Sequence, residues 1–145
     1  MSSKAAPVDR REMIRQFFRY ADAGDVRALD FYTDDVELTY PKFGTAVGKA
    51  AVKTFITHMS GVFRKLEHDI EGLSFIEDGN RIAVEGREWG EMADGSPFPD
   101  GKVSHGLFCN VYEFDGDLIR AVRIYVDPDF TSSDDATIGT LRPAG

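Results

Sequence analysis

The sequence has little of what would define several common protein classes. It contains a single cysteine in 145 residues, so no internal disulfide can form, and Cys109 completes no metal-binding motif. Its 3 histidines and its scattered carboxylates show no ligand spacing. It has no phosphate loop, no nucleophile elbow and no Cys/His arrangement typical of a thiol enzyme. We therefore predict neither a bound metal nor a cofactor.

Long apolar runs are also missing. No segment approaches the roughly 18 to 20 apolar residues of a membrane-spanning helix. The first residues, MSSKAAPVDRREM, contain no apolar stretch of the kind that forms a signal peptide. We therefore expect a cytoplasmic protein that does not enter a membrane.

Basic residues are in the minority, with 17 Lys and Arg against 25 Asp and Glu, and the formal net charge is −8. This balance argues against nucleic acid and against an anionic membrane surface as partners, because both attract a basic face. Hydrophobic residues make up 42% of the chain and include 11 Phe, which is enough for one packed core at this length. We predict a flexible N-terminus over residues 1–8, a single domain over 9–127 and a loosely held tail over 128–145.

The first half of the chain has mainly helical spacing of its apolar residues. Asp9, with Glu12 three residues later, resembles a capping box and marks the start of the first helix. A strand follows two helices, and Pro41 closes it. The expected elements are a helix from Asp9 to Gly24, a short helix from Asp25 to Thr33, a strand over 36–40 and a helix that begins at Gly48 and ends before Lys65.

After Lys65 the apolar period changes to two, which predicts strands. Asp78-Gly79-Asn80 is typical of a turn, and Asp115-Gly116 is a two-residue hairpin signal. The segment 93–101 is dense in Gly and Pro and predicts a loop. The expected strands cover 66–77, 81–92, 103–114 and 118–126. Helices followed by a run of antiparallel strands indicate an α+β fold, with the helices packed on one face of a curved sheet.

The last hairpin predicts which residues share a face. If Phe114 pairs with Asp117 across the turn, residues directly opposite each other point the same way. The aliphatic face, expected inside, then carries His105, Leu107, Cys109, Val111, Val122, Ile124 and Val126. The opposite face carries Phe108, Asn110, Tyr112, Arg123 and Tyr125. A one-residue slip in the turn would exchange these assignments.

This arrangement resembles the nuclear transport factor 2-like superfamily, and within it the SnoaL-like polyketide cyclases and ketosteroid isomerases. The resemblance covers nearly the whole chain. It implies a cone-shaped α+β barrel with N-terminal helices packed on a curved, mainly antiparallel sheet. The segments that carry it are Ala23-Gly24-Asp25, Phe31-Tyr32-Thr33-Asp34-Asp35-Val36, Gly48, Phe114-Asp115-Gly116 and Arg123-Ile124-Tyr125-Val126-Asp127.

The resemblance also directs attention to particular residues. The SnoaL-like cyclases use an acid–base Asp and a His deep in the cone; His105 fits the His by place, and Asp127 is the nearest candidate for the Asp. Ketosteroid isomerases have a carboxylate just before the proline that ends the first strand, where this chain has Tyr40. Their supporting tyrosine corresponds to Tyr32.

We therefore expect His105, Tyr40 and Asp127 to be catalytic, with Tyr40 and Tyr32 as hydrogen-bond donors to a developing oxyanion. His58, at the edge of the third helix, is either a cavity residue or a solvated one. Glu85, Arg87 and Trp89 alternate on one face of the strand over 81–92. Facing inward, they would form a polar anchor with an aromatic wall; facing outward, they would form a surface ion pair. The predicted substrate-binding residues are Tyr32, His58, Glu85, Arg87, Trp89, Leu107 and Ile124.

Two functions from different classes fit these observations. The first is a cofactor-independent acid–base enzyme (a cyclase, isomerase or dehydratase) acting on a small hydrophobic cyclic molecule. The second is a non-catalytic ligand-binding or assembly domain of the same fold. An enzyme should bring at least two titratable groups together in the cone. We also predict a homodimer through the outer sheet face, using Phe108, Tyr112 and Tyr125.

Overall fold

The computed structural model describes residues 9–101 and 105–144. The expected flexible N-terminus, residues 1–8, lies outside the described residues, as do the first two residues of the strand expected over 103–114. Within the described ranges, no helix is long and apolar enough to cross a membrane.

The helices begin where the sequence predicts. In α1 (Arg10–Asp22), the carboxylate of Asp9 accepts hydrogen bonds from the backbone N–H groups of Arg11 and Glu12, so the predicted N-cap is confirmed. A short 3-10 helix, η1 (Val26–Phe31), follows and is capped by Asp25. The third predicted helix is α2 (Lys49–Val62), which begins directly after Gly48.

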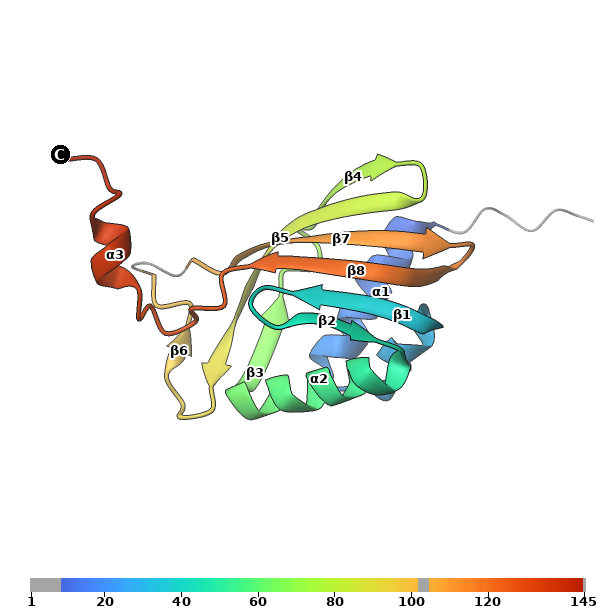
Figure 1. Cartoon of the computed structure of the whole chain (residues 1–145), viewed down its shortest axis with the longest axis horizontal. Coiled ribbons are helices and arrows are strands. Elements are labelled where there is room, and N and C mark those ends of the chain that lie inside the picture. Colours follow the sequence, from blue (N-terminus) through green and yellow to red (C-terminus); the bar gives the residue numbers. More distant parts are fainter. Residues whose placement is uncertain (1–8, 102–104, 145) are drawn as a thin grey trace, which may run out of the picture.

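Within the described residues, all strands belong to one 8-stranded mixed sheet (Figure 1). Its main order is β2-β1-β8-β7-β5-β3, and β4 and β6 both pair with β5. The pair β1–β8 is parallel, whereas the others are antiparallel. The strand bounds are β1 (Tyr32–Tyr40), β2 (Gly44–Val47), β3 (Phe63–His68), β4 (Ser74–Asp78), β5 (Arg81–Met92), β6 (Pro97–Phe98), β7 (Leu107–Asp115) and β8 (Leu118–Val126).

The strand predictions need three corrections. The predicted strand 66–77 is two strands, β3 and β4, because the segment between them turns back, with the carboxylate of Asp69 accepting a bond from the N–H of Gly72. β2 was not predicted; it forms a hairpin with β1 after Pro41. The loop 93–101 contains the two-residue strand β6.

The last hairpin has a different register from the predicted one. The turn residues are Gly116 and Asp117, so Asp115 pairs with Leu118, and the register shifts again between Glu113 and Phe114. Counting back along both strands, this places the even-numbered residues of β7 opposite the even-numbered residues of β8. The predicted inner face is therefore right for β8 and reversed for β7.

The consequence for β7 is visible in its burial. Phe108, Asn110, Tyr112 and Phe114 are buried, whereas Leu107 is exposed. The predicted dimer patch is therefore wrong at Phe108 and Tyr112, which belong to the core, and only Tyr125 lies outside. Away from the turn, the register differs from the predicted one by an odd number of residues, and this difference exchanges the inner and outer faces of β7 but not those of β8.

The sheet curls around a core that the helices close. Ile14, Phe17 and Phe18 of α1 and Val52 and Phe55 of α2 pack against its concave face. β5 makes the curvature possible, since its first half pairs with β4 and β7 and its second half with β3 and β6. The result is the expected cone-shaped α+β fold.

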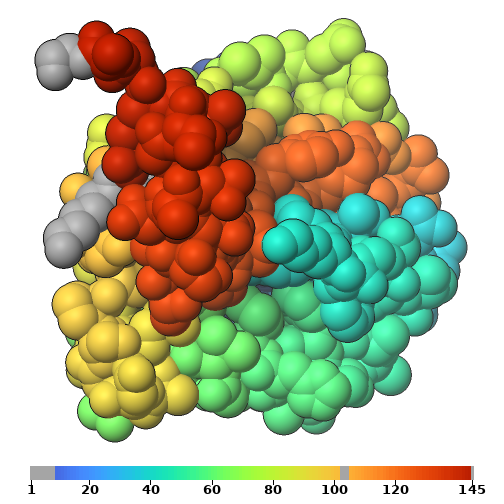
Figure 2. Space-filling model, turned by 60° about the vertical axis from the view of Figure 1, so that its left-hand side comes forward, coloured from blue at the N-terminus to red at the C-terminus, as the bar shows by residue number. Residues whose placement is uncertain are grey.

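The C-terminal segment leaves the end of β8 and crosses the rim of the cone (Figure 2). Phe130 packs edge-on against Phe63 and Phe98, in a small second cluster beside the main core. Beyond it, the short helix α3 (Asp135–Gly139) projects away from the sheet (Figure 1).

Candidate functional site in the cone

The concave side of the sheet encloses a cavity of about 370 Å³. This volume lies in the range of roughly 300–1,000 Å³ that is typical of small-molecule pockets. Its wall is mostly apolar and comes from α1, η1, β1, α2, β3 and the inner faces of β5, β7 and β8. The apolar side chains include Phe17, Phe18, Leu38, Phe55, Phe108 and Val122.

Three titratable side chains meet in this wall: Asp22, His68 and Glu88. The Nδ1 atom of His68 lies 2.6 Å from the Oδ1 atom of Asp22, and its Nε2 atom lies 3.2 Å from the Oε2 atom of Glu88. The other oxygen of Asp22 accepts a bond from the backbone N–H of His68 at 2.9 Å. The imidazole is therefore held on both sides, between Phe18 and Phe108.

This position changes the protonation of His68. Burial lowers the pKa of the imidazole, but the hydrogen bonds and negative charges of Asp22 and Glu88 outweigh burial and raise the pKa to about 9. At neutral pH both ring nitrogens are consequently protonated, and each donates to a carboxylate.

Backbone pairing places these groups together. His68 and Glu88 are direct partners in the antiparallel ladder between β3 and β5. The N–H of Glu88 also donates to the carbonyl of Gly106 at 2.8 Å. Gly106 has a φ of +68°, and a Cβ there would lie 2.2 Å from the carbonyl oxygen of Glu88. Only glycine allows the chain to pass so close behind Glu88.

Three predicted site residues line the cavity: Tyr32, Tyr40 and Ile124. Burial, and secondarily the negative charge of Glu88, raises the pKa of Tyr40 well above its usual range. Tyr32 also has a raised pKa, first through burial and then through the neighbouring Tyr112. Both phenols therefore remain hydrogen-bond donors at neutral pH, which is the state that we expected of them.

Four predicted site residues lie outside the cavity. His105 is exposed, so the prediction that it faces the interior is wrong, because the shifted hairpin register turns β7 over. Leu107 is exposed for the same reason. His58 lies on the solvent side of α2, and Asp127 is exposed just beyond β8, where it caps the backbone of Asp129.

Glu85, Arg87 and Trp89 lie on the outer face of β5, which decides between the two alternatives left open for them. The indole of Trp89 donates to Glu67 on the neighbouring strand instead of lining a pocket. The inner face carries Ile82, Val84, Gly86 and Glu88.

Asp22, His68 and Glu88 were not predicted from the sequence. One signal was present: on β5 the apolar residues Ile82 and Val84 have the same parity as Glu88, so period-two alternation puts this carboxylate on the apolar face. His68 gave no such signal, because its strand ends there and its register to β5 is a tertiary feature.

A second polar group lies deeper in the cavity, on the inner face of β7. The Nδ2 atom of Asn110 donates to the hydroxyl oxygen of Tyr112 at 3.1 Å. The Oδ1 atom of Asn110 is buried and has no hydrogen-bond partner among the described residues. As for metals, the part of the chain that the structure describes contains no group of three His, Cys, Asp or Glu side chains placed to hold an ion.

A curved sheet whose concave face and packed helices surround a mostly apolar cavity is the cone-shaped architecture of the nuclear transport factor 2-like superfamily. The pattern of the SnoaL-like domain family matches residues 14–122 of this chain. The chain therefore belongs to the SnoaL-like domain family. No curated protein matches it in sequence.

Solved structures show the same fold at low identity. An NTF2-like protein from Anabaena variabilis has 21% identity and a TM-score of 0.67, over 88% of this chain and 98% of that one. A candidate polyketide cyclase from Pseudomonas putida has 16% identity and a TM-score of 0.69, over 86% and 96% of the two chains. TerC, crystallised with polyporic acid, has 19% identity and a TM-score of 0.63, over 90% and 95%.

Proposed function

We propose that the protein is a cofactor-independent acid–base enzyme, a cyclase, isomerase or dehydratase, that acts on a small hydrophobic cyclic molecule bound in the cone. The observation that carries this proposal is the convergence of Asp22, His68 and Glu88 in the wall of a mostly apolar cavity. A cavity built only to hold an apolar ligand has no need for three buried charges, whose desolvation costs several kcal/mol per ion. The fold shared with candidate polyketide cyclases supports the same reaction class.

Within the cluster, Glu88 is the group that meets the substrate. Both N–H groups of His68 are engaged, one with each carboxylate, so the imidazolium has no proton to share with a ligand. Glu88 uses one oxygen toward His68 and retains a second oxygen that can accept a proton from carbon. His68 is a positioning residue that supplies the counter-charge and the orientation of Glu88.

Tyr40 supplies the complementary donor. Its hydroxyl is neutral, lines the same cavity and makes no hydrogen bond to another described residue. In the proposed step, Glu88 takes a proton from a carbon next to a carbonyl. The C–H electron pair then moves into an enolate whose oxygen accepts the Tyr40 hydrogen bond. Return of the proton from Glu88 to a different carbon of a conjugated enolate completes an isomerisation. For a cyclisation, the enolate carbon attacks a second carbonyl of the same molecule, and Glu88 returns the proton to the alkoxide that forms.

Proton exchange on a simple ketone tests this proposal without knowledge of the natural substrate. We expect the wild-type protein to accelerate deuterium incorporation at the α-carbon of 1-tetralone in D₂O, followed by NMR. Glu88→Gln should slow this exchange by 100-fold or more. Glu85→Gln, on the outer face of the same strand, is the matched control and should leave the rate unchanged.

The alternative is a non-catalytic ligand-binding or assembly domain of the same fold. It predicts that 1-tetralone binds without faster exchange, or that Glu88→Gln exchanges as fast as wild type. Either result would remove the acid–base role and leave the cone as a binding site.

A homodimer through the outer sheet face remains a proposal, now on different residues. The outer face exposes Leu107, Trp89 and Tyr125, at 57%, 42% and 53% of their surface respectively. Exposed aromatic and aliphatic side chains on a sheet face favour self-association. We expect light scattering to give twice the 16.1 kDa chain mass and Tyr125→Glu to return it to the monomer value, whereas Ile56→Glu on α2 should not.

A further inference from the structure

We infer that Asn110 and Tyr112 form a recognition site for a hydroxyl group on the ligand, at the inner end of the cavity. This inference rests on the proposed function, because it concerns the molecule on which the Glu88 end would act. It adds a requirement that the acid–base chemistry does not impose: the ring system should carry a hydroxyl at the end that enters first.

Asn110 and Tyr112 have hydrogen-bonding capacity that the protein does not use. Asn110 is 7% exposed and Tyr112 is 1% exposed, and both line the cavity. The amide nitrogen donates to the phenol oxygen, which leaves the amide oxygen without a partner among the described residues. A buried acceptor left unpaired is costly, so such groups are usually satisfied by water or a ligand.

The hydroxyl group of Tyr112 is a hydrogen-bond donor that complements this acceptor. The oxygen of Tyr112 accepts from Asn110, so its own O–H is still available, and no described residue accepts it. Burial raises the pKa of Tyr112, which keeps this proton in place at neutral pH. A free acceptor beside a free donor matches a hydroxyl, because a hydroxyl donates one hydrogen bond and accepts another.

Asn110 and Tyr112 lie at a distance from the cluster of Asp22, His68 and Glu88. Asn110 is the ladder partner of Val84, four residues before Glu88 on β5. At about 3.3 Å per residue, the two backbone positions are about 13 Å apart along the strand. The ring of Phe108 lies between them, against Gly86, where a Cβ would come within 2.8 Å of it. The cavity therefore has polar groups at two ends and an apolar middle, which fits a ring system and not a small acyclic acid.

Binding of two size-matched probes tests the inference independently of catalysis. We expect wild-type protein to bind 2-naphthol about tenfold more tightly than 2-methylnaphthalene, measured by fluorescence titration, since two net hydrogen bonds to neutral groups are at stake. Asn110→Leu, which removes only the acceptor, should lower this preference to about threefold and leave the affinity for 2-methylnaphthalene unchanged. Tyr112→Phe, which removes only the donor, should lower the preference to about threefold.

Two controls separate this site from the others. Asn80→Leu makes the same change at a turn outside the cavity, where the amide bonds the carbonyl of Phe114, and should keep the full preference. Glu88→Gln should also keep it, even where proton exchange is lost. Equal binding of both probes by wild type, or a hydroxyl preference that Asn110→Leu leaves at about tenfold, would overturn the inference. Loss of the preference in Glu88→Gln alone would place the hydroxyl at the other end and overturn it too.

Discussion

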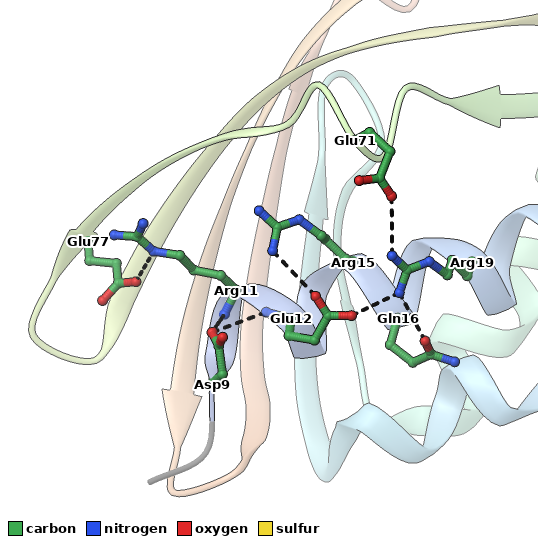
Figure 3. A network of polar contacts seen from close by, with 8 residues as sticks. All are labelled: Asp9, Arg11, Glu12, Arg15, Gln16, Arg19, Glu71 and Glu77. Atoms are coloured by element: carbon green, nitrogen blue, oxygen red, sulfur yellow. Dashed lines mark hydrogen bonds and ion pairs between the residues drawn. The ribbon is translucent and has the colours of Figure 1, made fainter.

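Helix α1 contributes to two charged clusters whose surroundings differ completely. On its outer side, surface contacts run from Glu77 through Arg11, Asp9, Glu12 and Arg19 to Glu71, and Arg15 also contacts Glu12 (Figure 3). At its C-terminal end, Asp22 belongs to the buried cluster with His68 and Glu88. Both clusters consist of carboxylates and cations at hydrogen-bond distance. Only the second has been removed from water.

Burial, and not the number of charges, decides how much an ion pair contributes to the stability of the fold. The outer network has more members, but solvent screens each pair, and its long side chains lose entropy when they are held. In the inner cluster only 8–15% of each side chain is exposed, so each group depends on the others more than on water. The outer cluster is therefore suited to tying α1 to β4, and the inner cluster to chemistry.

Removal of His68 should have the largest effect. In His68→Ala, Asp22 and Glu88 would be two buried carboxylates without a cation, and we expect the free energy of unfolding to fall by about 3–5 kcal/mol. Urea denaturation measures this change. His58→Ala, on the exposed side of α2, should change stability by less than about 0.5 kcal/mol. A His68 variant as stable as the His58 variant would show that the inner carboxylates are not charged.

The pH dependence of stability should follow from the same residue. The pKa of His68 is raised in the folded protein to about 9 from 6.5, so its stabilising effect is complete below pH 6.5 and is lost as the pH rises through 9. At about 1.4 kcal/mol per pKa unit, stability should fall by about 3 kcal/mol between these values. Thermal melts across this range should show the fall in wild type and a much flatter profile in His68→Gln. An equal fall in both proteins would assign the effect to other groups.

Replacing both polar groups at the inner end of the cavity should have a small effect on stability, in the opposite direction. Asn110→Leu with Tyr112→Phe removes an unpaired buried acceptor together with its neighbour's hydroxyl. Because apolar groups of similar shape replace both partners, we expect a stability between wild type and about 1 kcal/mol above it. Calorimetry would detect the change. A clear loss of stability would mean that ordered water satisfies Asn110 in the free protein.

The outer network should respond least. Glu12→Gln removes the carboxylate that contacts both Arg15 and Arg19, and those contacts, above all the one to Arg19, hold the pKa of Glu12 below its usual range. Since the group is fully solvated, we expect the smallest shift in denaturation midpoint of this series, and we expect 1 M NaCl to remove it. A larger shift in midpoint for Glu12→Gln than for the Asn110→Leu, Tyr112→Phe double variant would show that the exposed network matters more for stability than the polar pair inside the cavity.

The sequence by itself determined the parts of this protein that depend on neighbouring residues. Helix α1 starts at Asp9 because a carboxylate at the N-cap satisfies free backbone N–H groups, and β5 spans Arg81–Met92 because its side chains alternate over the whole length. The family resemblance and the cone fold were also within its reach. Among the site residues, Tyr32, Tyr40 and Ile124 were placed on the cavity correctly.

Only the tertiary structure decided which groups meet inside. The turn at Gly116-Asp117 and the register shift beside Glu113 moved β7 relative to β8, which turned His105 and Leu107 outward and brought Asn110 and Tyr112 inward. Asp22, His68 and Glu88 come from a helix end and two strands whose pairing is not encoded in any local pattern. Because side chains on a strand alternate, a shift of one residue exchanges inside for outside, and the burial of charge follows from that exchange.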